Sequence, residues 1–310
     1  MPARDTISVR CYPLPLALQP YFSGLYAVCT HHPAGDVVND YLHPEWAALR
    51  FTEGLPPLMS VGPGRLARQW PFTASGPTSR GVHFGLAHAR VWRLGVFPAG
   101  WARYVDMPAH ELADRTADGG NHPAFARFAP ITGLIAGTEG GTEGDEGEIA
   151  RLIVQHLLAL TPRPLPNEAQ LLACQAALRD PETSGVAELG GKAGISPRSL
   201  ERLCRRYFGF TPKLLLRRQR FMRSLAQFML DPKLTWAGAL DGQYHDQAQF
   251  VREFRAFMDL TPRQYAALPH PILDRVMRQD VAYAAFPPSV LDPLPAIRPV
   301  PRAAATAARD

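Results

Sequence analysis

An internal repeat constrains this chain more than any other feature of its sequence. The stretch LERLCRRYFGFTPK (200–213) aligns with FVREFRAFMDLTPR (250–263) at an offset of 50 residues. The identical positions are two arginines and a Thr-Pro pair, namely Arg202 and Arg252, Arg205 and Arg255, and 211–212 and 261–262. A repeat of this kind usually means one supersecondary unit used twice. The unit predicted here is a helix followed by a second helix that starts at Thr-Pro, because proline is favoured in the first helical turn.

The first copy has the features of a DNA-recognition helix. Ser196 is a good N-cap residue, and Pro197 follows it at the first helical position. On a helical wheel one face is apolar and the opposite face is charged. The apolar set is Leu200, Leu203, Cys204 and Tyr207, and the charged set is Arg198, Glu201, Arg202 and Arg205. The preceding AELGGKAGI (187–195) supplies a scaffold helix with Gly194 as the turn, so the segment predicts a helix-turn-helix.

The second copy repeats this design with different surface residues. Asp246 is the expected N-cap of a helix that buries three aromatic residues, Phe250, Phe254 and Phe257. The residues that face outward are Ala248, Gln249, Arg252 and Arg255, while Gln247 lies nearer the apolar side in the first turn. Glutamine can read adenine, arginine can read guanine, and an alanine methyl can pack on a thymine methyl. The alternative is that these side chains are only exposed.

Positive charge is concentrated in the same region. The whole chain carries a formal net charge of +5, with a pI near 9.2. Nine Arg and Lys residues against one acid, Glu201, lie between positions 198 and 223. The alternative for a charge run is a solvated helix face, but this density next to a helix-turn-helix favours the neutralisation of DNA phosphates.

These segments resemble the AraC/XylS family of transcription regulators. The resemblance rests on GISPRSLERLCRRYFGFTPK, YHDQAQFVREFRAFMDLTPRQY and the basic connector LLLRRQRFMRSLAQFML (214–230) between them. It implies an all-α domain in which a rigid connector helix sets two recognition helices into successive major-groove faces. Base contacts carried over by position fall on Arg198, Glu201, Arg202, Gln247, Ala248, Gln249 and Arg252. Phosphate contacts are expected at Ser196, Arg205, Arg206, Lys213, Arg217, Arg218, Arg255 and Arg263. The chain departs from the family pattern at Gly190 and Gly191, Cys204, Gly238 and Gln243.

The N-terminal part reads as a β-rich domain, since short apolar runs such as FSGLYAVCT (22–30) are broken by Gly and Pro. The stretch WRLGVFPAGWARYVDMPAHELADRT (92–116) is similar to a cupin-like barrel segment, with a short helix at 107–115. This resemblance implies a sensor or dimerisation module. A small-molecule pocket could be lined by Trp46, Trp70, Trp92, Phe97 and Trp101, although core packing is the simpler role for these residues.

The predicted fold class is therefore α+β multidomain, a β-rich cupin-like domain followed by an all-α double helix-turn-helix domain. The expected divisions are a β-rich domain at 1–136, an acidic loop, helix and Pro-rich linker at 137–166, the DNA-binding domain at 167–268, and an irregular Pro/Ala-rich tail at 269–310. The helix is expected in EIARLIVQHLLAL (148–160), whose apolar spacing is helical.

Other function classes lack a motif. The four cysteines are far apart, and the N-terminal histidines do not show metal-ligand spacing. Neither a phosphate-binding glycine loop nor a nucleophile elbow is present. We therefore predict no catalytic residue, metal or cofactor, no membrane association, and a cytoplasmic location.

The predicted function is sequence-specific regulation of transcription, with double-stranded DNA as the partner. A small-molecule effector, RNA polymerase and a second copy of the chain stay open as further partners. Two alternatives also stay open, a non-specific architectural DNA-binding protein and an enzyme whose N-terminal barrel is catalytic. The paired recognition faces argue against the first alternative.

Overall fold

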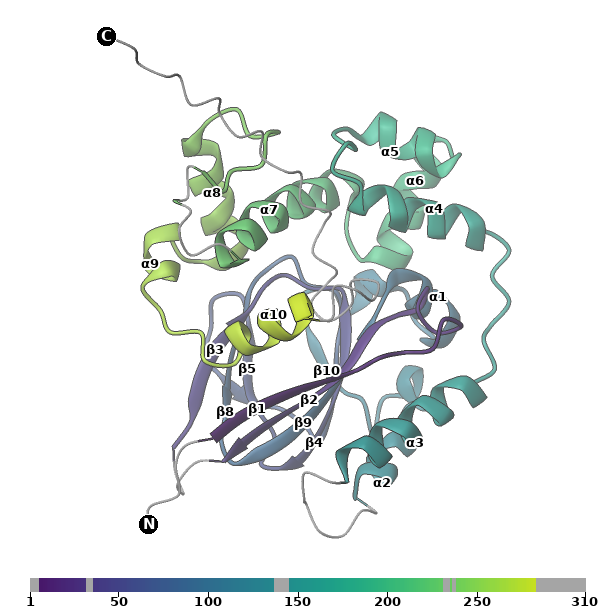
Figure 1. The fold of residues 1–310 in the computed structure, drawn as a ribbon. Helices are drawn as coiled ribbons and strands as arrows, with labels where there is room; N and C mark the ends of the chain where they lie inside the picture. The colour runs from purple at the N-terminus through teal and green to yellow at the C-terminus, as the bar shows by residue number, and fades with distance from the viewer. Residues whose placement is uncertain (1–5, 32–35, 137–144, 231–234, 236–237, 283–310) are drawn as a thin grey trace.

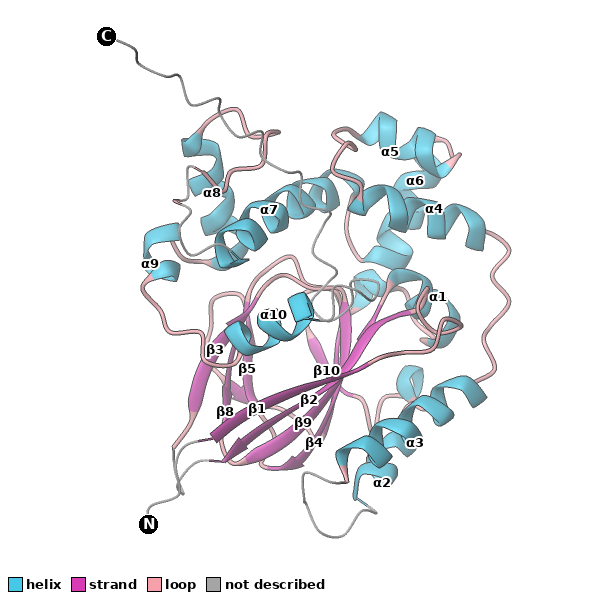
Figure 2. Ribbon diagram, viewed as in Figure 1, coloured by secondary structure: helices cyan, strands magenta, loops and turns pink. Residues whose placement is uncertain are grey.

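A computed structural model describes residues 6–31, 36–136, 145–230, 235 and 238–282 of the 310-residue chain. Two antiparallel sheets form the N-terminal domain, and a set of helices lies beside one end of them (Figure 1, Figure 2). Within the described ranges, every helix is either too short or too polar to span a lipid bilayer. The predicted fold class is confirmed.

The larger sheet has the strand order β1-β2-β9-β4-β7-β10, and the smaller sheet has the order β3-β8-β5-β6. The strands of the larger sheet are β1 (Thr6–Tyr12), β2 (Phe22–His31), β4 (Ala47–Gly54), β7 (Phe72–Ser75), β9 (Ala89–Val96) and β10 (Thr116–Asp118). Those of the smaller sheet are β3 (Val38–Leu42), β5 (Leu58–Val61), β6 (Ala67–Arg68) and β8 (Val82–Leu86). Strands β2 and β9 are buried along almost their whole length, which explains why their apolar runs are nearly continuous.

One face of the larger sheet is covered by helices of the N-terminal half. These are α1 (Pro98–Tyr104), α2 (Pro130–Ala136) and α3 (Glu146–Ala159), together with short 3₁₀ turns at Ala109–Glu111 and Pro123–Phe125. Trp92, Trp101, Phe125 and Ile153 pack in the core between this face and the helices. The helix expected at 148–160 is therefore confirmed, while only a 3₁₀ turn forms within 107–115.

The helices of the C-terminal domain follow an extended Pro-rich connection. They are α4 (Glu168–Arg179), α5 (Val186–Ala193), α6 (Pro197–Leu203), α7 (Pro212–Leu230), α8 (Gln247–Met258), α9 (Pro262–Ala266) and α10 (Leu273–Ala282). A π-helical turn at Cys204–Phe208 continues α6. The two domains share a hydrophobic cluster in which Trp46 and Phe97 pack with Phe208 and Leu215. The Pro-rich connection thus joins two domains that are packed against each other.

The prediction of an irregular tail from residue 269 is wrong for its first part. Helix α10 follows the last helix of the DNA-binding domain and returns to the β domain, where it covers the second face of the larger sheet (Figure 1). Its residues Leu273, Val276 and Met277 are buried against Val28 and Phe84. Prolines on both sides of this segment suggested irregular structure, but the apolar spacing of these residues suits one buried helix face. Residues 283–310, the rest of the expected tail, lie outside the described residues.

Candidate DNA-binding surface

The first helix-turn-helix unit forms as the sequence predicts. Helix α5 ends at Gly194, which has a φ of +65°, a conformation that favours glycine. The Ser196 hydroxyl oxygen then accepts a hydrogen bond from the backbone N–H of Ser199 at 3.3 Å and caps α6. Leu200 and Leu203 face the core, while Arg198 and Arg202 are exposed. The outer face of α6 is therefore free to approach a DNA groove.

Gly190, a departure from the family pattern, lies where two segments of this unit approach closely. A Cβ atom at this position would lie 3.3 Å from the carbonyl oxygen of Ile195, which is a tight contact. A glycine in α5 costs helix propensity, and the close approach of the turn offers a reason for it.

The second unit repeats the capping of the first. The Asp246 carboxylate accepts a hydrogen bond from the backbone N–H of Gln249 at 2.6 Å, which starts α8. Phe250, Phe254 and Phe257 are buried, as the spacing predicts. The repeat extends to the helix ends, because Asp259 closes α8 with a φ of +56°. The position equivalent to it in the first unit is a glycine that also has a positive φ. Residues 238–246 form turns, so a scaffold helix is not seen in the described residues just before α8.

The connector α7 separates the two recognition helices. In Figure 1 the group of α5 and α6 and the group of α8 and α9 lie at opposite ends of α7. Its 19 residues span about 29 Å at 1.5 Å per residue, close to the ~34 Å that separates successive major-groove faces. The length of α7 therefore suits the simultaneous approach of α6 and α8 to one side of a DNA duplex.

A buried carboxylate fastens α8 to this connector. Glu253 is 5% exposed and accepts hydrogen bonds from Arg217 at 3.0 Å, Arg220 at 2.6 Å and the Tyr244 hydroxyl at 2.8 Å. Burial, followed by the charge and the hydrogen bond of Glu253, raises the pKa of Tyr244, so this hydroxyl stays protonated and donates. The sequence alone did not point to Glu253, because its position lies between residues of the apolar face.

Gln243, which replaces a glycine common in the family, links the two units. Its amide oxygen accepts a hydrogen bond from Arg223 at 3.0 Å, and its amide nitrogen donates to the carbonyl oxygen of Pro181 at 2.8 Å. Arg223 is buried and also pairs with Asp241. These contacts connect the turn before α8 with the loop after α4.

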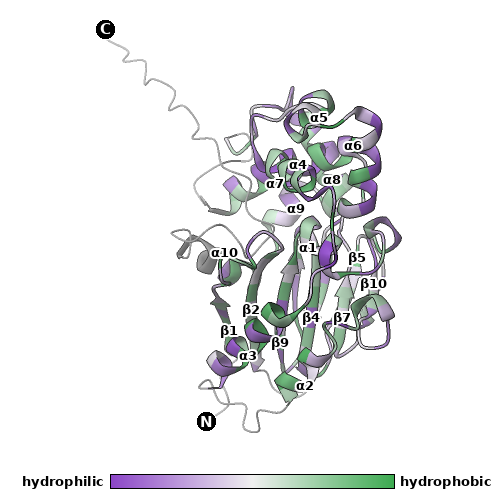
Figure 3. Ribbon diagram, turned by 90° about the vertical axis from the view of Figure 1, so that its right-hand side faces the viewer, coloured by the Kyte–Doolittle hydropathy of each residue, from purple (hydrophilic) through white to green (hydrophobic). Residues whose placement is uncertain are grey.

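The basic residues of the region do not all reach the surface. Among the nine between 198 and 223, five are exposed, namely Arg198, Arg202, Arg205, Arg206 and Lys213. Arg217 and Arg220 are half-buried on Glu253, and Arg218 and Arg223 are buried. In Figure 3 purple segments mark polar residues on the helices of this domain, including α6. The surface charge available to DNA is therefore smaller than the sequence count of nine.

The phosphate contact predicted for Arg218 is wrong in this arrangement. Its side chain is 0% exposed and donates hydrogen bonds to the carbonyl oxygens of Glu45 at 3.2 Å and Thr78 at 3.1 Å. Its guanidinium lies 3.7 Å from the ring centroid of Trp46. Arg218 is thus a contact between the connector helix and the β domain. The sequence could not reveal this, because its partners lie more than a hundred residues away in the chain.

The other predicted DNA-contacting side chains lie at or near the surface. Ser196, Gln247, Ala248, Arg252, Arg255 and Arg263 are exposed, while Glu201 and Gln249 are partly exposed. Besides Ser196, which caps α6, two of these side chains have partners within the chain. Glu201 pairs with Arg205 at 2.8 Å, and the Gln249 amide oxygen accepts a hydrogen bond from the backbone N–H of His245 at 3.1 Å. A base contact by Glu201 or Gln249 would have to replace or share these bonds.

The five aromatic residues suggested for an effector pocket do not converge on one cavity. Trp92 and Trp101 lie in the core beneath α1 to α3, and Trp46 and Phe97 lie in the cluster between the domains. Trp70 is 37% exposed at the surface. The pocket proposed on these residues is therefore corrected to core, interface and surface roles. Across the described residues no group of three His, Cys, Asp or Glu side chains is arranged to hold a metal ion.

Comparison with known proteins gives one family match. Residues 189–267 match a family model described as a helix-turn-helix domain. The comparison with curated protein sequences gave no match.

Two solved structures show weak similarity. The AraC-like transcriptional activator CuxR is 14% identical and matches over 71% of this chain and 87% of its own, with a TM-score of 0.25. A variant of apo ToxT from Vibrio cholerae is 9% identical and matches over 84% of this chain and 96% of its own, with a TM-score of 0.35. These scores are too low to support an argument about fold or function.

The matched residues 189–267 cover α6, α7, α8 and α9, which are the elements that the sequence resemblance concerned. The motifs of the two repeat units, their capping and their separation by α7 agree with that match. The chain therefore carries a DNA-binding domain of the AraC/XylS type behind a β-rich N-terminal domain.

Proposed function

We propose that this protein is a sequence-specific transcriptional regulator that binds two successive major-groove faces of DNA through α6 and α8. The observation that carries the proposal is the pair of capped helices with exposed polar faces at the two ends of a connector of suitable length. Base contacts are assigned to Arg198, Arg202, Gln247, Ala248 and Arg252, and in part to Glu201 and Gln249.

Phosphate contacts are assigned to exposed groups that flank these faces, namely Ser196, Arg205, Arg206, Lys213, Arg255 and Arg263. Such contacts position a protein on DNA but do not read its sequence. Binding by two recognition faces on one rigid connector favours a specific regulator over an architectural protein, because both faces must match their sequences at a fixed distance.

The test is fluorescence anisotropy with the promoter upstream of the protein's own gene and with a scrambled duplex, at about 0.15 M salt. The wild type is expected to prefer the promoter. Arg202→Ala is expected to reduce that preference by about 1–3 kcal/mol, as for an arginine that reads guanine. The matched control is Arg151→Ala, which removes an exposed, ion-paired arginine from α3 in the β domain.

Each outcome has a distinct meaning. Equal affinity for both duplexes, with a steep dependence on salt, would support the architectural alternative. Absence of binding to either duplex would contradict the proposal and direct attention to an enzymatic role of the β domain. A loss of affinity with Arg151→Ala as large as that with Arg202→Ala would show that α6 has no special role.

A further inference from the structure

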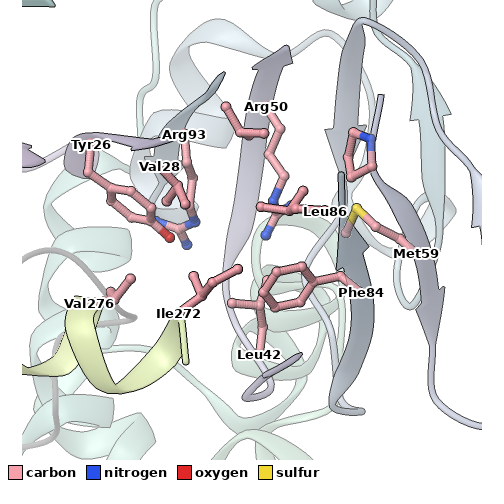
Figure 4. Close-up of a pocket in the computed structure, with 12 residues that line it drawn as sticks. Tyr26, Val28, Leu42, Arg50, Met59, Phe84, Leu86, Arg93, Ile272 and Val276 are labelled. Carbon is pink, nitrogen blue, oxygen red and sulfur yellow. The ribbon is translucent and has the colours of Figure 1, made fainter. Parts of the chain in front are cut away.

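A cavity lies between the two sheets and α10. Both sheets contribute to its lining, which includes Phe84, Arg50 and Arg93, and the C-terminal segment contributes Ile272 and Val276. Figure 4 shows Ile272 and Val276 pointing from the α10 segment toward the arginines. Most of the lining is apolar, which is typical of a site for a small molecule. One wall of the cavity therefore belongs to a helix that follows the DNA-binding domain.

Two arginines supply the charge of this cavity. Arg50 and Arg93 are direct partners in the register of β4 and β9, so they lie side by side on the same face of the sheet. Among the described residues that line the cavity, these two are cationic and none is acidic. Beyond the lining, Arg93 binds one carboxylate oxygen of Glu45 at 2.6 Å, and Arg50 pairs with the other. A guanidinium presents a fork of donors that matches a carboxylate.

Helix α10 is held over the cavity by a residue of the β domain. Asp40 on β3 accepts hydrogen bonds from the backbone N–H groups of Ile272 and Leu273, both at 2.8 Å, and so caps the start of α10. Its other oxygen contacts Nδ1 of His270 at 3.0 Å. Helix α10 is therefore held on the β domain by the carboxylate of Asp40 and by the apolar contacts of one helix face.

The cavity is too small for a drug-sized molecule while α10 is in place. Its volume is about 40 Å³. An engineered apolar cavity that binds benzene measures about 150 Å³. A ligand that reaches Arg50 and Arg93 would therefore have to displace α10, so that ligand binding and the docking of α10 exclude each other.

We propose that this cavity is the effector site of the regulator, that its ligand is a small apolar molecule with one carboxylate, and that α10 is a lid which the ligand displaces. The proposal rests on the proposed function, because the lid is an extension of the DNA-binding domain. Only six residues separate the end of α9 at Ala266 from the start of α10 at Leu273. Release of the lid would thus free the end of the second helix-turn-helix unit.

The same two arginines are also connected to the connector helix α7, through Glu45. The side chain of Glu45 binds Arg50 and Arg93, while its backbone carbonyl oxygen accepts the hydrogen bond of Arg218 on α7. The next residue, Trp46, lies under the guanidinium of Arg218. A ligand carboxylate that competes with Glu45 for the two arginines would therefore disturb residues 45 and 46, which contact Arg218 on α7.

The test measures binding of phenylbutyrate and of phenylbutanol, which differ in the carboxylate, to the full chain by ligand-observed NMR without DNA. The acid is expected to bind about tenfold more tightly than the alcohol, or better. Arg93→Met is expected to abolish this difference. The control Arg90→Met lies on the same strand, also removes ion pairs of a partly buried arginine, and is expected to keep it.

The lid is tested separately with Asp40→Ala, which removes the carboxylate that caps α10. Phenylbutyrate is expected to bind this variant about threefold more tightly or better, because it competes with a weaker contact. Equal binding of acid and alcohol to the wild type, or binding of neither, would overturn the site even if Arg93→Met did not fold. Unchanged or weaker binding to Asp40→Ala would overturn the lid. Anisotropy without these compounds reports on DNA binding alone, so failure of the effector site and failure of the regulator function are distinguishable.

Discussion

The guanidinium of Arg218 lies over the indole of Trp46, 3.7 Å from the ring centroid, and this contact joins the DNA-binding connector to the β domain. Both side chains are buried, and Arg218 also binds two backbone carbonyl oxygens of the β domain. A cation over a desolvated indole is a strong form of this interaction. The pair therefore makes the β domain part of the framework that holds the two recognition helices.

Loss of this arginine is expected to affect stability before it affects phosphate contacts. Arg218→Ala removes the cation–π contact and leaves the carbonyl oxygens of Glu45 and Thr78 without these donors. We expect the free energy of unfolding in urea to fall by about 3 kcal/mol. Arg205→Ala, at an exposed position, is expected to leave it nearly unchanged. If Arg218→Ala has normal stability and only a reduced salt dependence of DNA binding, Arg218 contacts a DNA phosphate after all.

Substitution by alanine is expected to reduce the unfolding free energy by different amounts at two glycines that both have a positive φ. Gly209 has a φ of +82°, and a Cβ atom there would lie 2.5 Å from Cγ of Pro77 in the β domain. Gly194 has a φ of +65°, but a Cβ atom there would meet open space. We expect Gly194→Ala to cost about 1 kcal/mol of unfolding free energy from backbone strain alone. Gly209→Ala should cost about 1–3 kcal/mol more, because it also crowds the domain interface. If both variants lose the same unfolding free energy in thermal or urea unfolding, the domain interface near Pro77 can move to accommodate the added Cβ atom without a cost.

The unfolding free energy should depend on pH through His43. Burial, and secondly the charge of His270, lower the pKa of His43 to about 3. The folded protein then holds this ring neutral, while the unfolded chain protonates it near its ordinary value of 6.5. The contribution to stability is present above pH 6.5 and is lost as the pH falls from 6.5 toward 3, by up to about 1.4 kcal/mol per pH unit.

The variant His43→Gln isolates this effect. Its side chain cannot take up a proton, so the difference in unfolding free energy between wild type and variant should shrink as the pH falls from 7 to 4.5. The control His110→Gln changes an exposed histidine and should give a difference that varies much less over this range. A constant difference for His43→Gln would show that the ring is protonated in the folded protein or is reached by water. In the wild type, Nε2 of His43 makes a hydrogen bond of 2.7 Å with the Tyr265 hydroxyl, and His43→Gln changes this contact as well.

The sequence predicted the local elements of the DNA-binding domain well, because their signals are local. Ser196 and Asp246 cap their helices as expected, and Gly194 forms the turn. These features depend on residues a few positions apart, where spacing and side-chain chemistry act directly.

Contacts between distant parts of the chain could not be predicted in the same way. The partners of Arg218 and Arg217 lie far from them in the sequence, and one arginine is buried on Trp46 while the other is half-buried on Glu253. The docking of α10 on the β domain could not be predicted either, because its cap, Asp40, lies 233 positions before Leu273. Each of these features depends on the packing of the β domain against the helices, which local periodicity does not encode.

The last prediction concerns the distance between the recognition helices. Glu253 is the carboxylate through which Arg217 and Arg220 hold α8 against α7. Glu253→Gln keeps the shape of the side chain but removes the charge and half of its acceptor capacity. We expect affinity for the promoter site to fall about tenfold, because α8 is no longer held at a fixed position relative to α6.

Loss of affinity alone would not separate positioning from a local defect, so the spacing of the DNA site is varied as well. Insertion of about five base pairs, half a helical turn, between the sequences bound by α6 and α8 should strongly weaken binding by the wild type. Glu253→Gln should lose much less on this insertion, since its helices already bind without fixed spacing. The control Glu148→Gln, which removes an exposed partner of Arg151 on α3, should respond as the wild type does. If Glu253→Gln also responds as the wild type does on both duplexes, apolar packing of Phe250, Phe254 and Phe257 is sufficient to fix α8, and the carboxylate has no positioning role.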